Sequence, residues 1–212
     1  MRAVIVAGSS LTSELEASRL ATADLLVAVD GGADALARVG LTPQILVGDM
    51  DSISTATRDI LQGRGVEMVL LSTSKDETDT EAALRLVVAR GADDITIYGA
   101  LGGPRLDHLL GNLLLLSSPW LAEVAVRMVD DRHEVFLVKG DAVLGGDPGD
   151  TVSLLPLSPE VEDVRTEGLL YPLACEPLFR FATRGVSNVM IGPEARVTHG
   201  EGVLLLIHYR GR

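Results

Sequence analysis

Short apolar strands alternate with helical stretches through the first 130 residues of this 212-residue chain. This alternation restricts the possible folds more than any other feature of the sequence. The expected strands lie at residues 3–7, 25–29, 45–47, 66–71, 95–98 and 124–129, and the expected helices at 13–23, 33–39, 55–62, 78–90 and 105–117. Because the strands are continuously apolar, they indicate a parallel sheet covered on both faces. We therefore predict a three-layer α/β domain over residues 1–130.

The pattern changes near residue 130, beyond which the sequence shows no convincing helical period. Short strands alternate with turns rich in Gly, Pro and Asp, at residues 133–139, 142–144, 151–156, 161–171, 181–191, 195–199 and 203–209. Strands at this spacing are typical of a small sandwich or barrel. We expect a small all-β sandwich domain over residues 131–212, joined to the first domain without a long flexible linker.

The charge and composition of the chain exclude several classes of partner. The formal net charge is −12, and aromatic residues make up only 3% of the chain. This balance argues against a nucleic-acid surface and against an anionic membrane. The apolar run at the start is too short for a signal peptide, and no stretch approaches the length of a membrane span. We therefore expect a cytoplasmic protein with neither nucleic acid nor membrane as a partner.

The segment Gly-Asp-Met-Asp-Ser at residues 48–52 follows one of the expected strands. Residues two apart in an extended chain point to the same side, so Asp49 and Asp51 can face one point in space. Two carboxylates that close repel each other unless a cation lies between them, and a hard divalent cation such as Mg²⁺ fits oxygen ligands. The alternative is a polar loop in which one Asp caps a helix.

Further acidic residues follow the neighbouring strands. Asp30 follows the second strand, Asp76 and Asp79 the fourth, and Asp107 the fifth. Ligands of open α/β sheets bind outside the carboxyl ends of the strands, which is the edge where these acids would gather. The alternative for Asp76 and Asp79 is that they only complement the dipole of the helix that begins there.

Basic and polar residues accompany the acids at this edge. Lys75 could contact a phosphate as a point charge, and Arg105 could hold phosphate oxygens in a bidentate manner. Pro104 suits the first position of a helix, and His108 and Asn112 lie four residues apart on one face of that helix. For His108 the favoured interpretation is a hydrogen-bonded histidine at the edge of the core.

Taken in order and spacing, several motifs of this chain resemble those of the thiamine pyrophosphokinase family. They are residues 30–33 (Asp-Gly-Gly-Ala), 48–52, 75–79 (Lys-Asp-Glu-Thr-Asp), 102–108 (Gly-Gly-Pro-Arg-Leu-Asp-His) with Asn112, 166–173 (Thr-Glu-Gly-Leu-Leu-Tyr-Pro-Leu) and 184–188 (Arg-Gly-Val-Ser-Asn). Each motif is weak alone, but the ordered set is specific and covers nearly the whole chain.

The resemblance implies a catalytic α/β domain followed by a thiamine-binding β-sandwich, in a homodimer whose active sites form where domains of different subunits meet. It implies transfer of the diphosphoryl group of ATP to the hydroxyethyl group of thiamine, giving thiamine diphosphate and AMP. By matching motif, Asp49, Asp51 and Asp79 would hold Mg²⁺.

The resemblance also implies the roles of the remaining motif residues. Asp107 would lie close to the metal ligands and belong to the catalytic set. The ATP and phosphate groups would contact the other residues of the acidic and basic turns, namely Asp30, Lys75, Asp76, Arg105 and Asn112. Ser187 and Asn188 would fall at the thiamine site.

The chain departs from the family pattern at the thiamine site. Leu170 stands where lysine is common, and the only tryptophan, Trp120, lies in the first domain. Some family members stack thiamine on a tryptophan. Here that role would fall to one of four other aromatic residues or be absent; the four are Tyr171, Phe179, Phe181 and Tyr209.

Two other functions remain open at this point. A related Mg²⁺-dependent diphosphokinase acting on another alcohol, such as a pterin methanol, would keep the acidic turns and differ in the second domain. A nucleotide- and metal-binding regulator without catalysis would be expected to lose one or more acidic turns, and here all are present. The matches at residues 171–173 and 187–188 favour thiamine as the acceptor.

Overall fold

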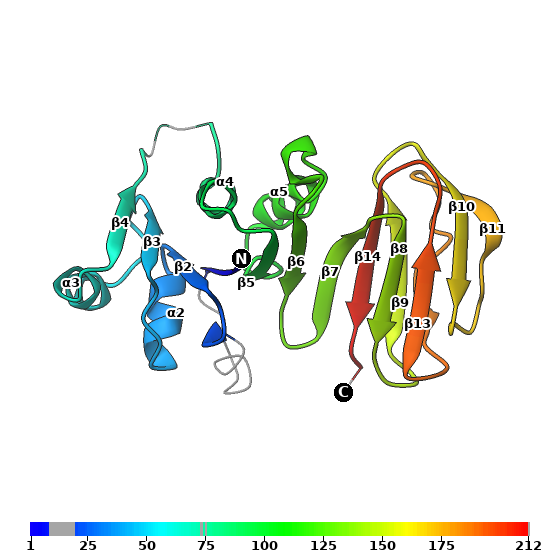
Figure 1. Cartoon of the computed structure of the whole chain (residues 1–212), viewed down its shortest axis with the longest axis horizontal. Helices are drawn as coiled ribbons and strands as arrows, with labels where there is room; N and C mark the ends of the chain where they lie inside the picture. Colours follow the sequence, from blue (N-terminus) through cyan, green and yellow to red (C-terminus); the bar gives the residue numbers. More distant parts are fainter. Residues whose placement is uncertain (9–19, 73, 75, 212) are drawn as a thin grey trace. The chain divides into compact units, whose positions relative to one another are not determined.

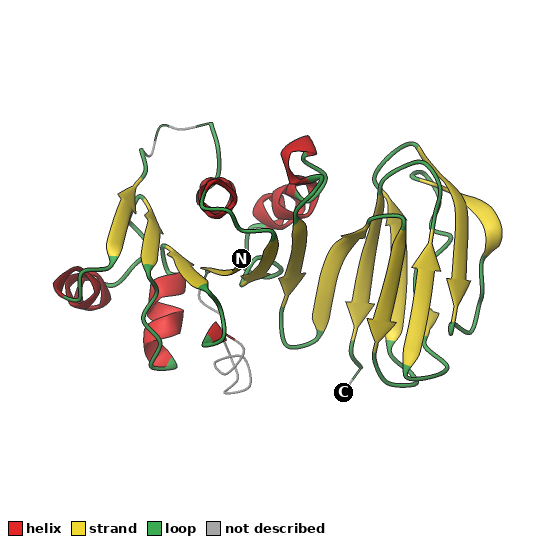
Figure 2. Ribbon diagram, in the orientation of Figure 1, coloured by secondary structure: helices red, strands yellow, loops and turns green. Residues whose placement is uncertain are grey.

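The chain is described by a computed structural model that covers residues 1–8, 20–72, 74 and 76–211. It forms two compact units, residues 1–131 and residues 132–212. Figure 1 traces both units along the chain, and Figure 2 separates helices from strands. The predicted helix at 13–23 lies, apart from its last residues, outside the described residues.

The first unit is built around a parallel sheet. Its strands follow the order β6-β5-β1-β2-β3-β4. Their bounds are β1 Arg2–Ala7, β2 Leu25–Val29, β3 Ile45–Gly48, β4 Glu67–Leu70, β5 Asp94–Tyr98 and β6 Ala125–Val129. The helices are α2 Gly32–Arg38, α3 Thr55–Gly63, α4 Asp79–Ala89 and α5 Leu106–Leu115, followed by the 3₁₀ turn η1 Pro119–Leu121.

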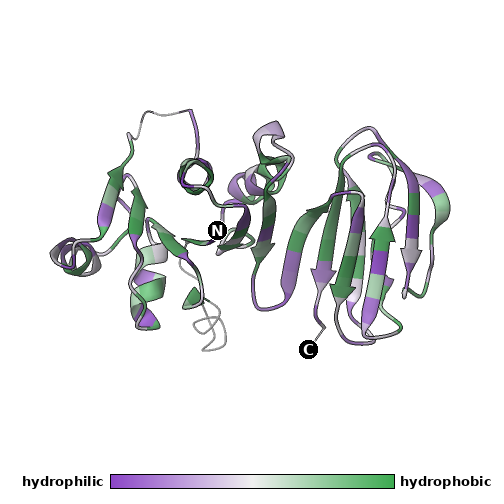
Figure 3. Cartoon of the chain, in the orientation of Figure 1, coloured by the Kyte–Doolittle hydropathy of each residue, from purple (hydrophilic) through white to green (hydrophobic). Residues whose placement is uncertain are grey.

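Helices cover both faces of this sheet. In Figure 1, α2 and α3 lie on one side of the strands, and α4 and α5 lie on the other. Strands β1, β2 and β3 are almost completely buried, and Figure 3 colours β2 and β3 mostly as hydrophobic. Burial of apolar side chains on both faces accounts for the continuous apolar runs in the sequence.

Local signals fix where two of these helices begin. The Thr78 hydroxyl accepts a hydrogen bond from the Glu81 N–H at 3.1 Å and caps α4, as its sequence predicts. Ser54 caps α3 in the same way through the Thr57 N–H. The prediction for Pro104 is wrong: Arg105 is the N-cap of α5, so Pro104 precedes the helix.

The second unit consists of two antiparallel sheets. One sheet has the strands β12-β9-β14-β7 and the other has β11-β10-β13-β8. The strand bounds are β7 His133–Val138, β8 Asp141–Gly145, β9 Thr151–Pro156, β10 Glu160–Glu167, β11 Ala174–Phe179, β12 Asn188–Val189, β13 Glu194–Thr198 and β14 Leu204–Tyr209.

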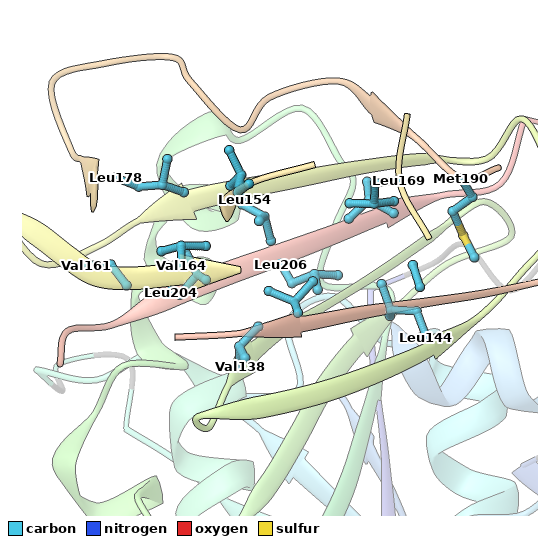
Figure 4. Close-up of a cluster of buried hydrophobic side chains, with 14 residues drawn as sticks. Val138, Leu144, Leu154, Val161, Val164, Leu169, Leu178, Met190, Leu204 and Leu206 are labelled. Atoms are coloured by element: carbon cyan, nitrogen blue, oxygen red, sulfur yellow. The ribbon is translucent and has the colours of Figure 1, made fainter. Parts of the chain in front are cut away.

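A single apolar core joins the two sheets of the second unit. Leu154 and Leu206 from one sheet and Val164 and Val197 from the other are all at most 2% exposed and belong to one cluster (Figure 4). Alternating burial along β9, with every second residue buried, places this core on one face of its sheet. The predicted fold class, a three-layer α/β domain followed by a small β-sandwich, is confirmed.

In the second unit, one strand prediction is too long at its end and another is wrong over most of its length. The expected strand at 161–171 ends at Glu167. The expected strand at 181–191 is mostly turns, and its pairing is limited to β12 and an isolated bridge between Met190 and Leu169. A strand that the sequence did not predict, β11 at Ala174–Phe179, pairs with β10. Pro177 makes this segment hard to recognise as a strand, because proline argues against a strand in the middle of a sheet. It is tolerated here because β11 forms the edge of its sheet.

Among the described residues, none of the helices is both long enough and apolar enough to cross a membrane.

Candidate active site

A cavity of about 850 Å³ opens in the first unit at the carboxyl ends of the parallel strands. Its walls come from the ends of β1 and β2, the turn after β3 and the beginnings of α4 and α5. Five of the residues predicted from sequence line this one cavity: Asp30, Asp49, Asp51, Asp79 and Arg105. The sheet edge therefore gathers residues that are up to 75 positions apart, from Asp30 to Arg105.

The turn after β3 is built against the Asp30 carboxylate. The Met50 N–H donates to Asp30 Oδ1 at 3.1 Å, and Asp30 and Met50 both adopt left-handed backbone, with φ of 42° and 68°. A Cβ at Gly48 would lie 1.8 Å from Asp30 Oδ1, so no other residue fits there without displacing the carboxylate. Asp30 thus shapes the turn that presents Asp49 and Asp51.

Hydrogen bonds between neighbouring residues hold the two aspartates of this turn. The Asp51 N–H donates to Asp49 Oδ1 at 3.1 Å, and the Ser52 hydroxyl donates to Asp51 Oδ1 at 2.6 Å. Just beyond, Asp34 of α2 accepts bonds from both the N–H and the hydroxyl of Ser54. The turn is therefore fixed at its two ends, while Asp49 and Asp51 remain on the cavity wall.

The carboxylates at this edge crowd one another. Burial raises the pKa of Asp30 from its ordinary 3.8 to about 6, and the negative charges of Asp79, Asp49 and Asp51 add to the increase. The Met50 N–H opposes this change by stabilising the charged form. The part of the increase that comes from the three neighbouring aspartates is the part that a bound cation would relieve.

Arg105 brings a basic side chain to the lining of the cavity. Its guanidinium makes a bidentate pair with Asp107, with Arg105 Nε 2.9 Å from Asp107 Oδ1. This pairing holds the pKa of Asp107 well below its usual range. Asp107 itself is not part of the cavity lining. Its carboxylate holds the guanidinium of Arg105, which does line the cavity.

The remaining predicted residues of this unit are placed differently. Asp76 is exposed and does not line the cavity. Asn112 is buried, and its Nδ2 donates to the Ala100 carbonyl at 3.2 Å, so it supports the loop that precedes α5. Lys75 lies outside the described residues.

Sequence reasoning missed two ionisable residues of the cavity wall. His108 is exposed and lines the cavity, so its interpretation as a histidine at the edge of the core is wrong. Glu77 also lines it and approaches Arg85 at 3.5 Å. The position of Glu77 between Asp76 and Asp79 was the available signal. For His108 the signal was its place one residue after Asp107, in the first turn of α5.

The donor atoms at this edge suit Mg²⁺. Asp49, Asp51 and Asp79 offer hard carboxylate oxygens, the ligand type that Mg²⁺ prefers. Within the part of the chain that the structure describes, no three His, Cys, Asp or Glu side chains are already arranged to hold a metal ion. Mg²⁺ commonly takes only one or two carboxylates from a protein and completes its shell with water and substrate phosphates. The residues therefore fit a metal that binds together with a phosphate group.

The predicted thiamine residues lie in the second unit. Ser187 has left-handed backbone, with φ of 60°, and its N–H donates to the Ser153 hydroxyl at 3.0 Å. Asn188 is buried at the start of β12, and its side chain bonds the backbone of Tyr171. The two residues thus belong to a turn that is tied to the loop after β10.

Comparison with known families decides the relationship of the chain. Residues 17–128 match the family model described as the thiamin pyrophosphokinase catalytic domain, and residues 138–204 match the thiamin pyrophosphokinase vitamin B1 binding domain. The chain belongs to the thiamin pyrophosphokinase family. The resemblance drawn from the sequence motifs is confirmed.

Individual relatives of the thiamin pyrophosphokinase family agree with this assignment over most of the chain. A thiamine pyrophosphokinase from Bacillus subtilis is 28% identical over 185 residues, which is 86% of each chain. A crystal structure of thiamine pyrophosphokinase from Bacillus subtilis has a TM-score of 0.87 at 27% identity and 100% coverage of both chains. The Geobacillus thermodenitrificans structure has a TM-score of 0.83 at 29% identity, covering 99% of this chain and 97% of that one.

Proposed function

We propose that this chain transfers the diphosphoryl group of ATP to thiamine, giving thiamine diphosphate and AMP. The observation that carries the proposal is the ordered match to the catalytic and vitamin B1 binding domains of one family. The acid-lined cavity in the first of these regions supports it, because it offers the groups that phosphoryl transfer needs. The second match favours thiamine over another alcohol, such as a pterin methanol, as the acceptor.

The first unit would hold the nucleotide. We assign Asp49, Asp51 and Asp79 as the ligands of Mg²⁺ bound with ATP; the chemistry that the metal supplies is neutralisation of charge on the phosphate oxygens. Asp30 would support this set by fixing the turn after β3. The bonds between Asp30 and Met50 and between Asp49 and Asp51 support this division of roles.

Basic and polar groups would complete the nucleotide site. Arg105 would bind phosphate oxygens, and Asp107 would act by orienting the Arg105 guanidinium. Asn112 would support the same loop through its bond to Ala100. Asp76 and Lys75 would also contact the ATP phosphates, and the motif at residues 75–79 is the support for this role.

The transfer makes one bond and breaks one bond. The hydroxyl oxygen of thiamine forms a bond to the β-phosphorus of ATP, and the bond from that phosphorus to the oxygen bridging to the α-phosphorus breaks. AMP leaves with the bridging oxygen, and the hydroxyl proton passes to solvent or to a base. The residues of the cavity act by positioning the phosphates and balancing their charge, which is the main demand of phosphoryl transfer.

The second unit would hold thiamine at the turn that contains Ser187 and Asn188. The exposed position of Ser187 and the match to the vitamin B1 binding domain support this assignment. We also propose that the protein is cytoplasmic, without nucleic-acid or membrane partners. The net charge of −12 supports this part of the proposal.

We further propose that the protein is a homodimer. Leu106, Leu110 and Leu114 lie four residues apart on α5, and each is at least half exposed. Such an apolar stripe is stabilised when a second surface covers it. Analytical sedimentation should give a dimer at working concentration. A monomer with full activity would contradict this assignment.

Phosphorus NMR of the purified chain with Mg²⁺, ATP and thiamine tests the main proposal. We expect AMP and thiamine diphosphate to appear in equal amounts. ADP with thiamine monophosphate, or no transfer to thiamine at all, would overturn the proposed function.

A further inference from the structure

We propose that Asp150 and His208 form a buried pair that positions the turn at residues 185–190 for thiamine binding. This inference rests on the proposed function, which assigns Ser187 and Asn188 of that turn to thiamine. Both members of the pair lie outside the motifs that resemble the family. They are positioning residues, and they act through the strand that lies between them and the turn.

The two side chains meet in the interior of the second unit. His208 Nε2 lies 3.0 Å from Asp150 Oδ2, and the two residues are 0% and 5% exposed. The same oxygen, Asp150 Oδ2, also accepts from the Asp147 N–H at 3.0 Å. The other carboxylate oxygen of Asp150 accepts from the Gly211 N–H at 3.4 Å. The Asp150 carboxylate is thus bonded on both of its oxygens.

These hydrogen bonds keep the Asp150 carboxylate charged. Burial acts to raise the pKa of Asp150, but the bonds from the Asp147 N–H, His208 and the Gly211 N–H outweigh it and lower the pKa below its ordinary value. A charged carboxylate only accepts hydrogen bonds, so His208 Nε2 carries the hydrogen of the shared bond. His208 Nδ1 is buried without a hydrogen-bond partner among the described residues. The hydrogen bonding of the His208 ring is therefore directed at Asp150.

The backbone of Gly146 packs closely against the pair. A Cβ at Gly146 would lie 2.8 Å from Asp150 Oδ2 and 3.0 Å from His208 Nε2. It would also lie 2.8 Å from the sulfur of Met190, at the end of the turn. Contacts this short leave no room for a side chain at Gly146. The pair and the end of the turn are therefore packed around the same backbone position.

Strand β9 connects the pair to the turn. It lies between β14 and β12, and Val152 is paired with His208 of β14 on one side and with Asn188 of β12 on the other. Residues paired across a sheet point to the same face, and all three are at most 7% exposed. A displacement of His208 would therefore change the packing of Val152 and, beside it, of Asn188.

Backbone hydrogen bonds hold the turn along β9. The Met190 N–H donates to the Asp150 carbonyl at 2.8 Å, and the Gly149 N–H donates to the Met190 carbonyl at 2.9 Å. Further along the strand, the Ser187 N–H donates to the Ser153 hydroxyl at 3.0 Å. Asp150 therefore holds one end of the turn through its own carbonyl. The position of the Asp150 side chain and the position of the turn are coupled.

The polar pair occupies a place that an apolar side chain could fill. Leu204 and Leu206 precede His208 at alternate positions of β14, and both belong to the apolar core. Apolar residues in place of a buried charged group and its partner are often as stable or more stable. What the pair supplies is a fixed geometry, because each hydrogen bond requires a narrow range of distance and angle. Such a pair suits a part of the fold whose position matters for binding.

The test measures steady-state kinetics of the full chain with Mg²⁺, ATP and thiamine. His208→Leu keeps a large side chain in the core and removes the donor to Asp150. We expect its thiamine KM to rise about 3- to 10-fold, while its ATP KM stays the same. His208→Gln should keep the thiamine KM close to that of the parent, because its side-chain amide can donate to Asp150 in place of Nε2.

A matched control separates positioning from a general loss of stability. Val197→Ala leaves a cavity in the same core and should lower the melting temperature without changing the thiamine KM. Amide hydrogen exchange without substrates gives a second readout. His208→Leu should speed exchange in residues 188–190 more than in the rest of the second unit, and Val197→Ala should not.

A second variant covers the case in which His208→Leu does not fold. Asp150→Asn keeps the size of the side chain, removes the buried charge and makes the bond to His208 a weaker, neutral one. Its thiamine KM should rise about threefold, again with the ATP KM unchanged. A thiamine KM equal to that of the parent would overturn the inference in this variant as well.

The outcomes separate this inference from the proposed function. If the parent forms no thiamine diphosphate, the proposed function itself fails. If the parent is active and the thiamine KM of His208→Leu lies within twofold of it, the positioning role is wrong. The role is also wrong if His208→Gln is impaired as much as His208→Leu, or if Val197→Ala raises the thiamine KM to the same extent. A rise confined to the ATP KM would likewise overturn it.

Discussion

The cavity of the first unit and the exposed loop of the second unit are built in opposite ways. In the first unit, the turns after parallel strands bring like charges together, and burial, with a smaller contribution from these charges, raises the pKa of Asp30 to about 6. In the second unit, hydrogen bonds between the buried Asn188 side chain and the Tyr171 backbone hold a loop in which the Tyr171 side chain is exposed. The first arrangement suits a cation and phosphates, and the second suits an organic molecule.

The difference predicts separate roles for the two units in binding the two substrates. Repulsion between the carboxylates disfavours the charged cavity, and binding of a cation would relieve it. The loop of the second unit is held in place before the ligand binds. Substitutions in the first unit should therefore change catalysis or the use of ATP, and substitutions at the loop should change the use of thiamine.

The largest effect is expected at the acidic turn. Asp51→Asn keeps the shape of the side chain but removes a formal charge and weakens an oxygen ligand. Turnover should fall by about 10²- to 10³-fold, corresponding to about 3–4 kcal/mol of transition-state stabilisation. AMP formation across a Mg²⁺ titration measures it, with thermal unfolding as the check on folding. Asp59→Asn, an exposed aspartate on α3, is the control. Turnover of Asp51→Asn within a few-fold of the parent would remove Asp51 from the metal set.

A smaller effect is expected at the basic side chain of the cavity lining. Arg105→Ala removes a guanidinium that Asp107 holds in a bidentate pair. The ATP KM should rise about tenfold, or about 1.4 kcal/mol, while the thiamine KM stays the same. Initial rates at varied ATP and then varied thiamine give both constants, and Arg58→Ala on α3 is the matched control. A change confined to the thiamine KM would contradict the division between the two units.

A substitution in the second unit should show the reverse pattern. Ser187 has left-handed backbone, which asparagine tolerates better than most residues. Ser187→Asn should therefore fold while adding bulk at the predicted thiamine surface. We expect the thiamine KM to rise about fivefold, or about 1 kcal/mol, with the ATP KM unchanged. An unchanged thiamine KM with a raised ATP KM would count against this placement.

The smallest effect concerns stability and pH. Between pH 3.8 and about 6, folded Asp30 keeps a proton that the unfolded chain has released. Stability therefore falls as pH rises through this window, and the cost persists above it. Asp30→Asn lacks this cost, so its stability relative to the parent should increase from pH 4 to pH 7 by about 1 kcal/mol at most, because water screens a half-exposed carboxyl. Chemical denaturation at several pH values measures the difference. A difference that does not vary with pH would show that Asp30 has an ordinary pKa.

Much of the first unit could be predicted from the sequence because its signals are local. Continuous apolar strands and the Thr78 cap place the elements, and a parallel sheet brings its strand ends to one edge. The pairing of Asp107 with Arg105 could not be predicted, since the sequence does not say which charges pair. The exposure of His108 was missed for a similar reason, because only the packing of α5 decides which of its faces is covered.

The second unit was harder to predict because its strands are short and irregular. β11 contains Pro177 and pairs through register shifts, which hide it from a search for alternating residues. The backbone of Tyr171 is held by hydrogen bonds with the side chain of Asn188, which is 17 residues away: the Tyr171 N–H donates to Oδ1, and the Tyr171 carbonyl accepts from Nδ2. A contact of this kind depends on how two turns pack together, and neither turn reveals it alone.

Amide hydrogen exchange of the full chain, with each substrate added separately, tests most directly the claim that the two units bind different substrates. Ligand binding slows exchange where it stabilises local structure. We predict that ATP with Mg²⁺ slows exchange in residues 48–52 and 77–80, and that thiamine slows exchange in residues 168–173 and 185–189. Protection of the acidic turns by thiamine alone, or of the Tyr171 loop by ATP with Mg²⁺ alone, would contradict the account.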